Sequence, residues 1–237
     1  MAYGATGRIL RVDLTRMRCH TEQLDEDVYR LYPGGKALAG YFLLRELVPG
    51  TDALSPDNVL VVANGLLTGA PVSTASRFTV AARSPLTGAY GESEAGGYFG
   101  PELKMAGYEA IVVTGRAATP VYLAIRDGHF ELRDARSLWG REPEEVQTAI
   151  RAELGDSYVR VLQIGPGGEN LVRYAALTNE LAHFNGRTGM GAVMGSKNLK
   201  AIAVRGKSRY IQGVSDPAPV TELGKALANL RETQAQL

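Results

Sequence analysis

The amino-acid sequence predicts an α+β fold of mostly antiparallel sheets with short helices, and three observations lead to this class. Residues 120–135, PVYLAIRDGHFELRDA, are typical of a hairpin that turns at Asp127-Gly128, and a hairpin pairs its strands antiparallel. The predicted strands do not alternate with full-length helices, as a doubly wound parallel sheet requires. Residues 97–115 and 191–206 both run from a glycine turn through a short helix to a strand and a glycine, which indicates an internal duplication.

The individual elements follow from hydrophobic periodicity and from the turn residues that bound each segment. Strands are expected at 7–15, 58–65, 76–84, 108–115, 158–165 and 171–178. Helices are expected at 25–33, 36–48, 98–107 and 142–154, the last with acidic residues at its positive end. In the helix at 36–48 one face carries Ala37, Tyr41, Leu44 and Leu47-Val48, so we expect this face to be buried.

The chain divides, on its sequence, into a domain at 1–210 and a helical segment at 211–237. Within the second segment, one helical stripe carries Val220, Leu223, Leu227 and Leu230, and no glycine or other stop signal follows it. Such a stripe needs a surface to pack against. That surface is either this domain or a second domain of a longer chain, to which the segment leads.

Composition and charge exclude several classes of function. The 237 residues are 45% hydrophobic and 22% charged, and their formal net charge is +1. Neither nucleic acid nor an anionic membrane is therefore expected as the main partner. No apolar run approaches the roughly 20 residues of a membrane span, and the N-terminus lacks the form of a signal peptide. These features favour a cytoplasmic protein.

Cysteine and histidine usage argues against a site built from clustered metal ligands. The single cysteine, Cys19, excludes a disulfide framework and any multi-cysteine metal site within this chain. His20, His129 and His183 are scattered and have no zinc-type spacing. A ligand site in this chain must therefore use other groups.

A glycine-rich stretch at 183–198, HFNGRTGMGAVMGSKN, raises the possibility of a nucleotide site. Gly189, Gly191 and Gly195 imitate a dinucleotide fingerprint, but no buried strand precedes them and no acidic residue lies about twenty positions later. A Walker loop fails as well, because here the order is glycine, serine, lysine. The spacing argues against a nucleotide-binding dehydrogenase.

A phosphate-binding function remains open for the same stretch. Glycine-rich backbone offers close N–H donors, and Arg187 adds a planar fork that is always charged. A second glycine cluster at 92–100 precedes a predicted helix, and Arg77 opens a predicted strand. The alternative is that Arg77 and Arg187 are ordinary surface arginines in solvated turns.

A long ordered series of segments resembles the N-terminal domain of the aldehyde ferredoxin oxidoreductase family, the tungsten- and molybdenum-dependent enzymes with a bis-pterin cofactor. The resemblance runs from residue 7 to about 206. Its segments are GRILRVDLT, GGKALA, LSPDNVLVVANGLLTG, SRFTVAARSPLTG, GGYFGPELKMAGYEAIVVTG, IGPGGENLVRYAAL and GRTGMGAVMGSKNLKAIAV. It implies an α+β domain with an internal pseudo-twofold, in agreement with the repeat noted above.

The resemblance also implies which residues hold the cofactor. In the family two pterin dithiolenes sit on this domain, a magnesium ion bridges their phosphates, and the dithiolene sulfurs hold the tungsten or molybdenum. The implied cofactor-binding residues are Arg77, Glu94, Ala95, Gly96, His183, Phe184, Gly186 and Arg187. The implied magnesium ligands are the backbone carbonyls of Glu94 and Phe184. The family usually has asparagine at the position of Glu94, and some relatives carry arginine at that of His183.

The function that the resemblance implies is oxidation of an aldehyde to a carboxylic acid, with electron transfer through a 4Fe-4S iron–sulfur cluster to ferredoxin or another carrier. The cluster and the acid/base residues are expected in downstream domains, so this chain alone is expected to be inactive as an oxidoreductase. Two alternatives remain: a non-catalytic pterin- or phosphate-binding subunit, and a family member that reduces aromatic acid thioesters. The choice between tungsten and molybdenum stays open, and the resemblance also allows a homodimer.

Overall fold

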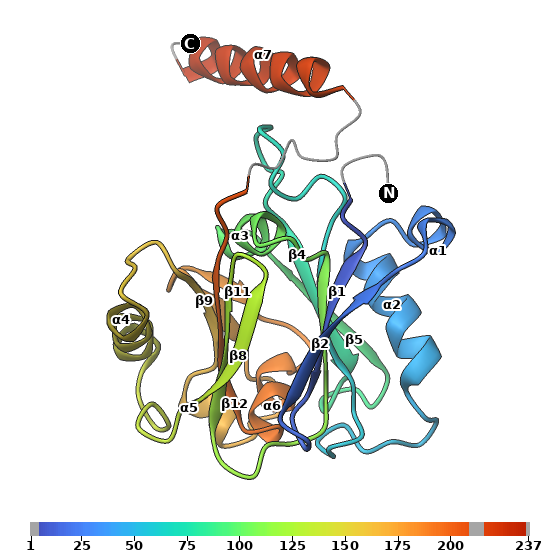
Figure 1. Cartoon of the computed structure of the whole chain (residues 1–237), viewed down its shortest axis with the longest axis vertical. Coiled ribbons are helices and arrows are strands. Elements are labelled where there is room, and N and C mark those ends of the chain that lie inside the picture. Colours follow the sequence, from blue (N-terminus) through green and yellow to red (C-terminus); the bar gives the residue numbers. More distant parts are fainter. Residues whose placement is uncertain (1–4, 209–215, 236–237) are drawn as a thin grey trace.

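The computed structural model describes residues 5–208 and 216–235, and within them the chain folds into two six-stranded sheets with short helices (Figure 1). The first sheet has the strand order β2-β1-β6-β3-β4-β5. Its strands are β1 (Arg8–Asp13), β2 (Arg18–Gln23), β3 (Leu60–Asn64), β4 (Phe78–Arg83), β5 (Tyr90–Ala95) and β6 (Ala110–Thr114). The helices of this part are α1 (Glu26–Leu31), α2 (Gly35–Glu46) and α3 (Phe99–Met105).

The second sheet has the strand order β11-β10-β9-β12-β7-β8. Its strands are β7 (Val121–Arg126), β8 (His129–Asp134), β9 (Arg160–Gln163), β10 (Leu177–Asn179), β11 (His183–Asn185) and β12 (Leu199–Arg205). Its helices are α4 (Pro143–Leu154), α5 (Pro166–Glu169) and α6 (Met190–Ser196). The helix α7 (Pro217–Ala235) follows.

The two sheets are copies of one topology, which confirms the predicted duplication. The parallel pair β1–β6 corresponds to the parallel pair β7–β12, and the other pairings in each sheet are antiparallel. In each unit a covering helix follows the first hairpin, and a second helix (α3 or α6) precedes the last strand. The predicted hairpin at 120–135 is β7–β8, and its turn residues Asp127 and Gly128 both have positive φ. The α+β class is therefore confirmed.

Alternation along the strands produces three hydrophobic layers. The central core lies between the sheets and includes Leu10, Val62, Leu123 and Ile202 together with residues of α3 and α6. On the outer face of the first sheet, α2 packs over residues such as Val61 and Val112. On the outer face of the second sheet, α4 packs over residues such as Val161 and Ala203. Figure 1 shows α2 and α4 on opposite outer sides, with α3 and α6 between the sheets.

The buried face of α2 differs from the prediction. Leu38, Ala39, Phe42 and Leu43 are buried, whereas Leu44 is 87% exposed. Apolar residues occur around much of this helix, so periodicity alone does not select one face. The helix turns the face with Phe42 towards the sheet because that side chain fills the space above β3 and β6.

Strands with polar sequences were not predicted. The strands β2, β5 and β11 lie at the edges of the sheets; β5 alternates between buried and more exposed residues, whereas β2 has no buried residue and β11 has one. The predicted strand at 171–178 is wrong over most of its length, because only Leu177–Asn179 forms β10 and the residues before it turn. Short edge strands need little apolar sequence, since solvent covers much of their surface.

Each unit buries a lysine–glutamate pair. In the first unit, Lys104 Nζ lies 3.1 Å from a carboxylate oxygen of Glu109. In the second unit, Lys200 pairs with Glu169, and both side chains are almost fully buried. Glu109 and Lys200 directly precede the matching segments AIVVTG and AIAVRG. The duplicated positions therefore carry opposite charges, and each is neutralised by a different neighbour.

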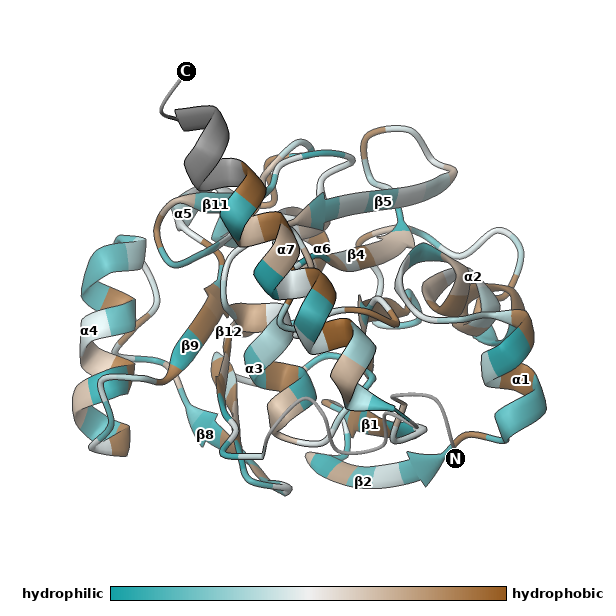
Figure 2. Ribbon diagram, turned by 90° about the horizontal axis from the view of Figure 1, so that it is seen from above, coloured by the Kyte–Doolittle hydropathy of each residue, from teal (hydrophilic) through white to brown (hydrophobic). Residues whose placement is uncertain are grey.

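The predicted helical segment after residue 210 contains α7, while residues 209–215 and 236–237 lie outside the described residues, as do 1–4. Along α7, Val220 and Leu227 are partly buried, whereas Leu223 and Leu230 are 53% and 60% exposed. Figure 2 shows hydrophobic residues interspersed with hydrophilic ones along α7. Within the described part of the chain, no helix combines the length and the apolar character needed to cross a bilayer.

Candidate functional site

The two units meet where the edge strand β5 of the first sheet lies beside β11 of the second. Asn185 donates from Nδ2 to the carbonyl of Ser93 at 2.8 Å. The backbone N–H of Arg187 donates to Ser93 Oγ at 3.2 Å, and Thr188 Oγ1 donates to the carbonyl of Glu92 at 3.1 Å. The turn after β11 is therefore fastened to β5 through three separate hydrogen bonds.

Strand register relates the two hairpins at this junction. In the first unit, Thr79 pairs with Glu94 in the β4–β5 hairpin. In the second unit, Thr178 pairs with Phe184 in the β10–β11 hairpin. Glu94 and Phe184 thus stand at corresponding positions of the two copies. Two groups at such positions can approach one ligand from two sides.

A pocket of about 410 Å³ lies at this junction, and we call it the junction pocket. It is lined by Lys36, Arg77, Glu92, Ser93, Glu94, Phe184, Gly186 and Arg187. The structure therefore gathers Arg77, Glu94, Phe184, Gly186 and Arg187, which the sequence resemblance had implied together. These residues come from both units, and more than one hundred residues separate Arg77 from Arg187 along the chain.

The remaining predicted residues, Ala95, Gly96 and His183, do not line the pocket but support it. Asn179 donates from Nδ2 to the carbonyls of Gly96 (3.3 Å) and His183 (3.4 Å), and so joins the two turns. Gly97 has φ +90°, and a Cβ there would lie 2.3 Å from Asn179 Oδ1 and 2.8 Å from the His183 ring. Only glycine fits at this position. Ala95 is buried beneath the pocket wall.

The charges of the junction pocket are arranged unevenly. Arg77 and Arg187 are exposed, and within residues 5–208 and 216–235 neither guanidinium has a hydrogen-bond or ion-pair partner. Lys36 Nζ instead lies 3.2 Å from Glu92 and 3.4 Å from Glu94. The hydrogen bond to Glu92, and then the charges of both carboxylates, raise the pKa of Lys36. The pocket therefore offers two planar cations that have no partner among the described residues, beside two carboxylates that share one lysine.

Three residues that line the pocket, Lys36, Glu92 and Ser93, were not predicted from the sequence, and neither was the supporting Asn179. Lys36 lies in the first turn of α2, 56 residues before its partner Glu92. Glu92 and Ser93 belong to the stretch ESEAGGYFG, from which only residues 94–96 had been predicted as site residues, and Asn179 sits in a short strand that was not delimited. The GGK sequence at 34–36 was the one available signal, and it does not indicate which loop the lysine faces.

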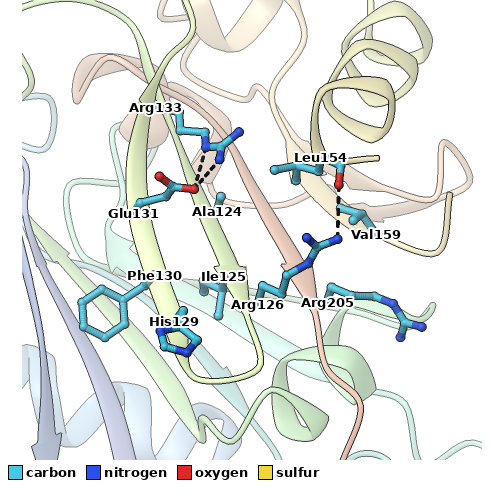
Figure 3. A pocket seen from close by; sticks show the side chains of 10 residues that line it. All are labelled: Ala124, Ile125, Arg126, His129, Phe130, Glu131, Arg133, Leu154, Val159 and Arg205. Atoms are coloured by element: carbon cyan, nitrogen blue, oxygen red, sulfur yellow. Dashed lines mark hydrogen bonds and ion pairs between the residues drawn. The ribbon is translucent and has the colours of Figure 1, made fainter. Parts of the chain in front are cut away.

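A second pocket, which we call the hairpin pocket, lies beside the β7–β8 hairpin and has a volume of about 420 Å³ (Figure 3). Its three arginines already have partners. Arg133 pairs with Glu131 and Glu153, and Arg205 pairs with Asp156 and Glu102. Arg126 donates to the carbonyl of Leu154. Because these cations are matched, the hairpin pocket is less suited to an anion than the junction pocket.

The donor groups available for a metal ion are limited. Among the described residues, no three His, Cys, Asp or Glu side chains gather closely enough to hold one. Burial raises the pKa of the Cys19 thiol to about 11, so this cysteine is a packing residue and a poor ligand at neutral pH. A metal ion at the junction pocket would therefore rely on backbone carbonyls or on groups of a bound cofactor.

The fold and the site together define a class: a duplicated α+β domain with an arginine-bearing pocket between its two halves. The chain belongs to the aldehyde ferredoxin oxidoreductase family, because the family model for the N-terminal domain of aldehyde ferredoxin oxidoreductase matches residues 9–206. The tungsten-containing aldehyde ferredoxin oxidoreductase of Pyrococcus furiosus is 46% identical over 230 residues. That alignment covers 97% of this chain and 37% of the relative.

Other relatives fit the same family. The tungsten-containing aldehyde ferredoxin oxidoreductase of Thermococcus kodakarensis is 44% identical over 97% of this chain and 37% of its own length. A solved structure, the active-site complex BamBC of benzoyl coenzyme A reductase with 1,5-dienoyl-CoA, superposes with a TM-score of 0.86 and 38% identity. The alignment covers 88% of this chain and 32% of that chain. The chain thus spans about a third of the length of these relatives.

Proposed function

We propose that residues 1–210 form the cofactor-binding domain of a tungsten- or molybdenum-dependent bis-pterin oxidoreductase, and that 211–237 begin a helical segment leading to its next domain. The enzyme would oxidise aldehydes to carboxylic acids. The observation that carries the proposal is the pair of guanidinium groups of Arg77 and Arg187, which line one pocket from the two units and have no partner among the described residues. The family membership of the chain supports the identity of the ligand.

The junction pocket suits the phosphates of a pterin cofactor. An arginine fork matches a phosphate with two parallel hydrogen bonds, and each unit supplies one fork. Glu94 and Phe184 line the pocket at corresponding positions, so their backbone carbonyls would hold the magnesium ion of such a cofactor. Mg²⁺ takes oxygen ligands and is commonly bound through phosphate oxygens and waters with few protein groups, so the lack of a side-chain cluster among the described residues is compatible with this assignment.

The residues present fit this cofactor, and each has a distinct part. Arg77 and Arg187 bind phosphate, while Asn179 and Gly97 hold the two turns at a fixed separation. The bis-pterin metal centre supplies the two-electron redox chemistry when it is bound. The described residues hold no cysteine set for an iron–sulfur cluster, so we assign the 4Fe-4S cluster and the contact with ferredoxin to the rest of the enzyme. This chain alone would bind the cofactor without turnover.

A second candidate function is reduction of an aromatic acid thioester, which the likeness to a benzoyl coenzyme A reductase complex favours. A third is a free-standing pterin-binding subunit. The reading frame after Leu237 separates the last from the others: a continuation with a cysteine run supports an enzyme, and a stop codon supports a subunit. Activity of the complete enzyme with aldehydes or with aromatic acid thioesters then separates the two reactions.

The proposal is tested by the cofactor content of the complete enzyme. We expect Arg77→Ala and Arg187→Ala each to weaken cofactor binding by about 1.5–3 kcal/mol, the usual value of a charged hydrogen bond. Tungsten, molybdenum and pterin per chain are measured in each variant. Arg126→Ala, in the hairpin pocket, is the matched control and should retain the cofactor. Unchanged metal and pterin content in both junction variants would show that these arginines are solvated surface residues.

A further inference from the structure

Two carboxylates lie in the same pocket as the arginines that would bind phosphate. The side chains of Glu92 and Glu94 are 29% and 36% exposed, and both belong to β5, which forms one wall of the junction pocket. Alone they would repel a phosphate group entering between Arg77 and Arg187. The pocket therefore needs a positive charge that compensates these carboxylates.

Lys36 is placed to do this. Its Nζ lies 3.2 Å from Glu92 and 3.4 Å from Glu94, although α2 is remote from β5 in the sequence. With Lys36, the five charged side chains of the pocket sum to +1, from three cations and two carboxylates. Without it the sum is zero, and the carboxylates face the ligand unshielded.

We propose that Lys36 is a charge-balancing residue of the cofactor site: it offsets one of the two negative charges of Glu92 and Glu94 so that Arg77 and Arg187 can bind phosphate. This inference rests on the proposed function. Lys36 acts through the carboxylates rather than by gripping phosphate itself, because its ammonium group is already shared between two carboxylate oxygens. Arg77 and Arg187, by contrast, have no protein partner among the described residues.

The ion pair between Lys36 and Glu94 also explains how the pocket accommodates an acidic residue at position 94. Glu94 and Phe184 occupy corresponding positions, and the copy in the second unit is apolar. The acid is thus an asymmetric feature of the first unit. Lys36 supplies the compensating charge from the first turn of α2, whereas the other covering helix, α4, begins with Pro143, Glu144 and Glu145.

The test is a double-mutant cycle in the complete enzyme, prepared without cofactor and titrated with inorganic pyrophosphate by calorimetry at low salt. We expect Lys36→Ala to weaken pyrophosphate binding roughly three- to ten-fold, the range expected when two partly exposed ion pairs are lost. In the Glu92→Gln/Glu94→Gln background the same change should have less than about a two-fold effect. Lys36→Arg should keep the wild-type affinity, since it retains the charge.

Two further measurements separate the outcomes. Lys207→Ala removes a comparably exposed lysine, paired with Asp127 at 3.8 Å, and should leave pyrophosphate binding unchanged. Metal and pterin content of each variant, made with cofactor supplied, should follow the same ranking. An equal loss for Lys36→Ala in both backgrounds, or no loss in the wild-type background, would overturn the charge-balancing role. If the wild-type enzyme holds neither pterin nor pyrophosphate, the proposed function itself fails.

Discussion

The two units of the molecule share a topology but differ in the length of one hairpin. In the first unit, β4 and β5 have six residues each, while β10 and β11 of the second have three each. The long hairpin forms a wall that carries Glu92 and Glu94. The short hairpin is followed directly by the turn with Gly186 and Arg187, which is hydrogen-bonded to that wall. Duplication thus brings two topologically equivalent turns together. The difference in length between the two hairpins creates a pocket between these turns.

The same contrast appears in the interior. Glu109 accepts hydrogen bonds from Tyr29 and Thr6 in addition to its pairing with Lys104. Glu169 has only the backbone N–H of Gly140 besides Lys200 among its described partners. The first buried carboxylate is therefore supported by several donors, whereas the second depends mainly on one lysine. Four comparisons between substitutions test how far the two units differ.

The largest effect is expected from breaking the buried pair of the second unit. Lys200→Met would leave Glu169 buried and poorly compensated, at a cost of about 3–5 kcal/mol. Lys104→Met should cost less, because Glu109 keeps its other donors. Hydrogen exchange of the amides of β12 and β6 measures each unit separately. The double variant Lys200→Met/Glu169→Leu should recover much of the loss, and equal costs for the two lysines would remove the distinction.

The second-largest difference is expected between the stability costs of substituting glycine in the two turns of the junction. Gly97→Ala should destabilise the junction by about 2–3 kcal/mol, because φ is +90° and the new methyl group would collide with Asn179. At Gly186 the corresponding Cβ would lie an ordinary 3.8 Å from Phe184, so Gly186→Ala should cost less than about 1 kcal/mol. Exchange of the β5 and β11 amides, together with cofactor content, measures both. Comparable losses would contradict the steric argument.

A smaller difference is expected at a pair of corresponding edge positions. Cys19 pairs with Val12, and Phe130 with Ile125, so register makes them counterparts in the two units, and both pack against the central core. Phe130→Ala should cost about 1–2 kcal/mol and Cys19→Ala less than about 1 kcal/mol, in proportion to the apolar area lost. Thermal unfolding midpoints provide the comparison, and a larger shift for the cysteine would show that the two positions are not equivalent in packing.

The smallest effect concerns the start of a covering helix. The Glu145 carboxylate accepts a hydrogen bond from the N–H of Glu142 at 3.2 Å, whereas α2 begins after Gly34 without a side-chain cap. Glu145→Ala should therefore cost about 0.5–1 kcal/mol. Glu144→Ala removes a neighbouring charge from the same helical turn and serves as the control. Equal hydrogen-exchange rates in α4 for the two variants would show that only the interaction of the acidic charge with the helix dipole contributes, and not the hydrogen bond of Glu145.

Local patterns in the chain were sufficient for a large part of the fold. Apolar runs bounded by glycine or proline predicted strands that match β1, β3, β4, β6 and β9, and the Asp127-Gly128 turn predicted the β7–β8 hairpin. These features depend on contacts between residues near in sequence or on burial of a continuous apolar run, and both are visible in one dimension. The repeat of AIVVTG and AIAVRG likewise revealed the duplication.

The tertiary structure alone decided the rest, because the deciding contacts join remote segments. The buried face of α2 is selected by the sheet beneath Phe42, and β5 and β11 exist because each closes the edge of a sheet. Resemblance named Arg77 and Arg187 as partners in one site, but only the packing of the two units shows them sharing a pocket. Lys36 lies in the site because α2 packs over the first sheet, and no local sequence pattern specifies that position of α2.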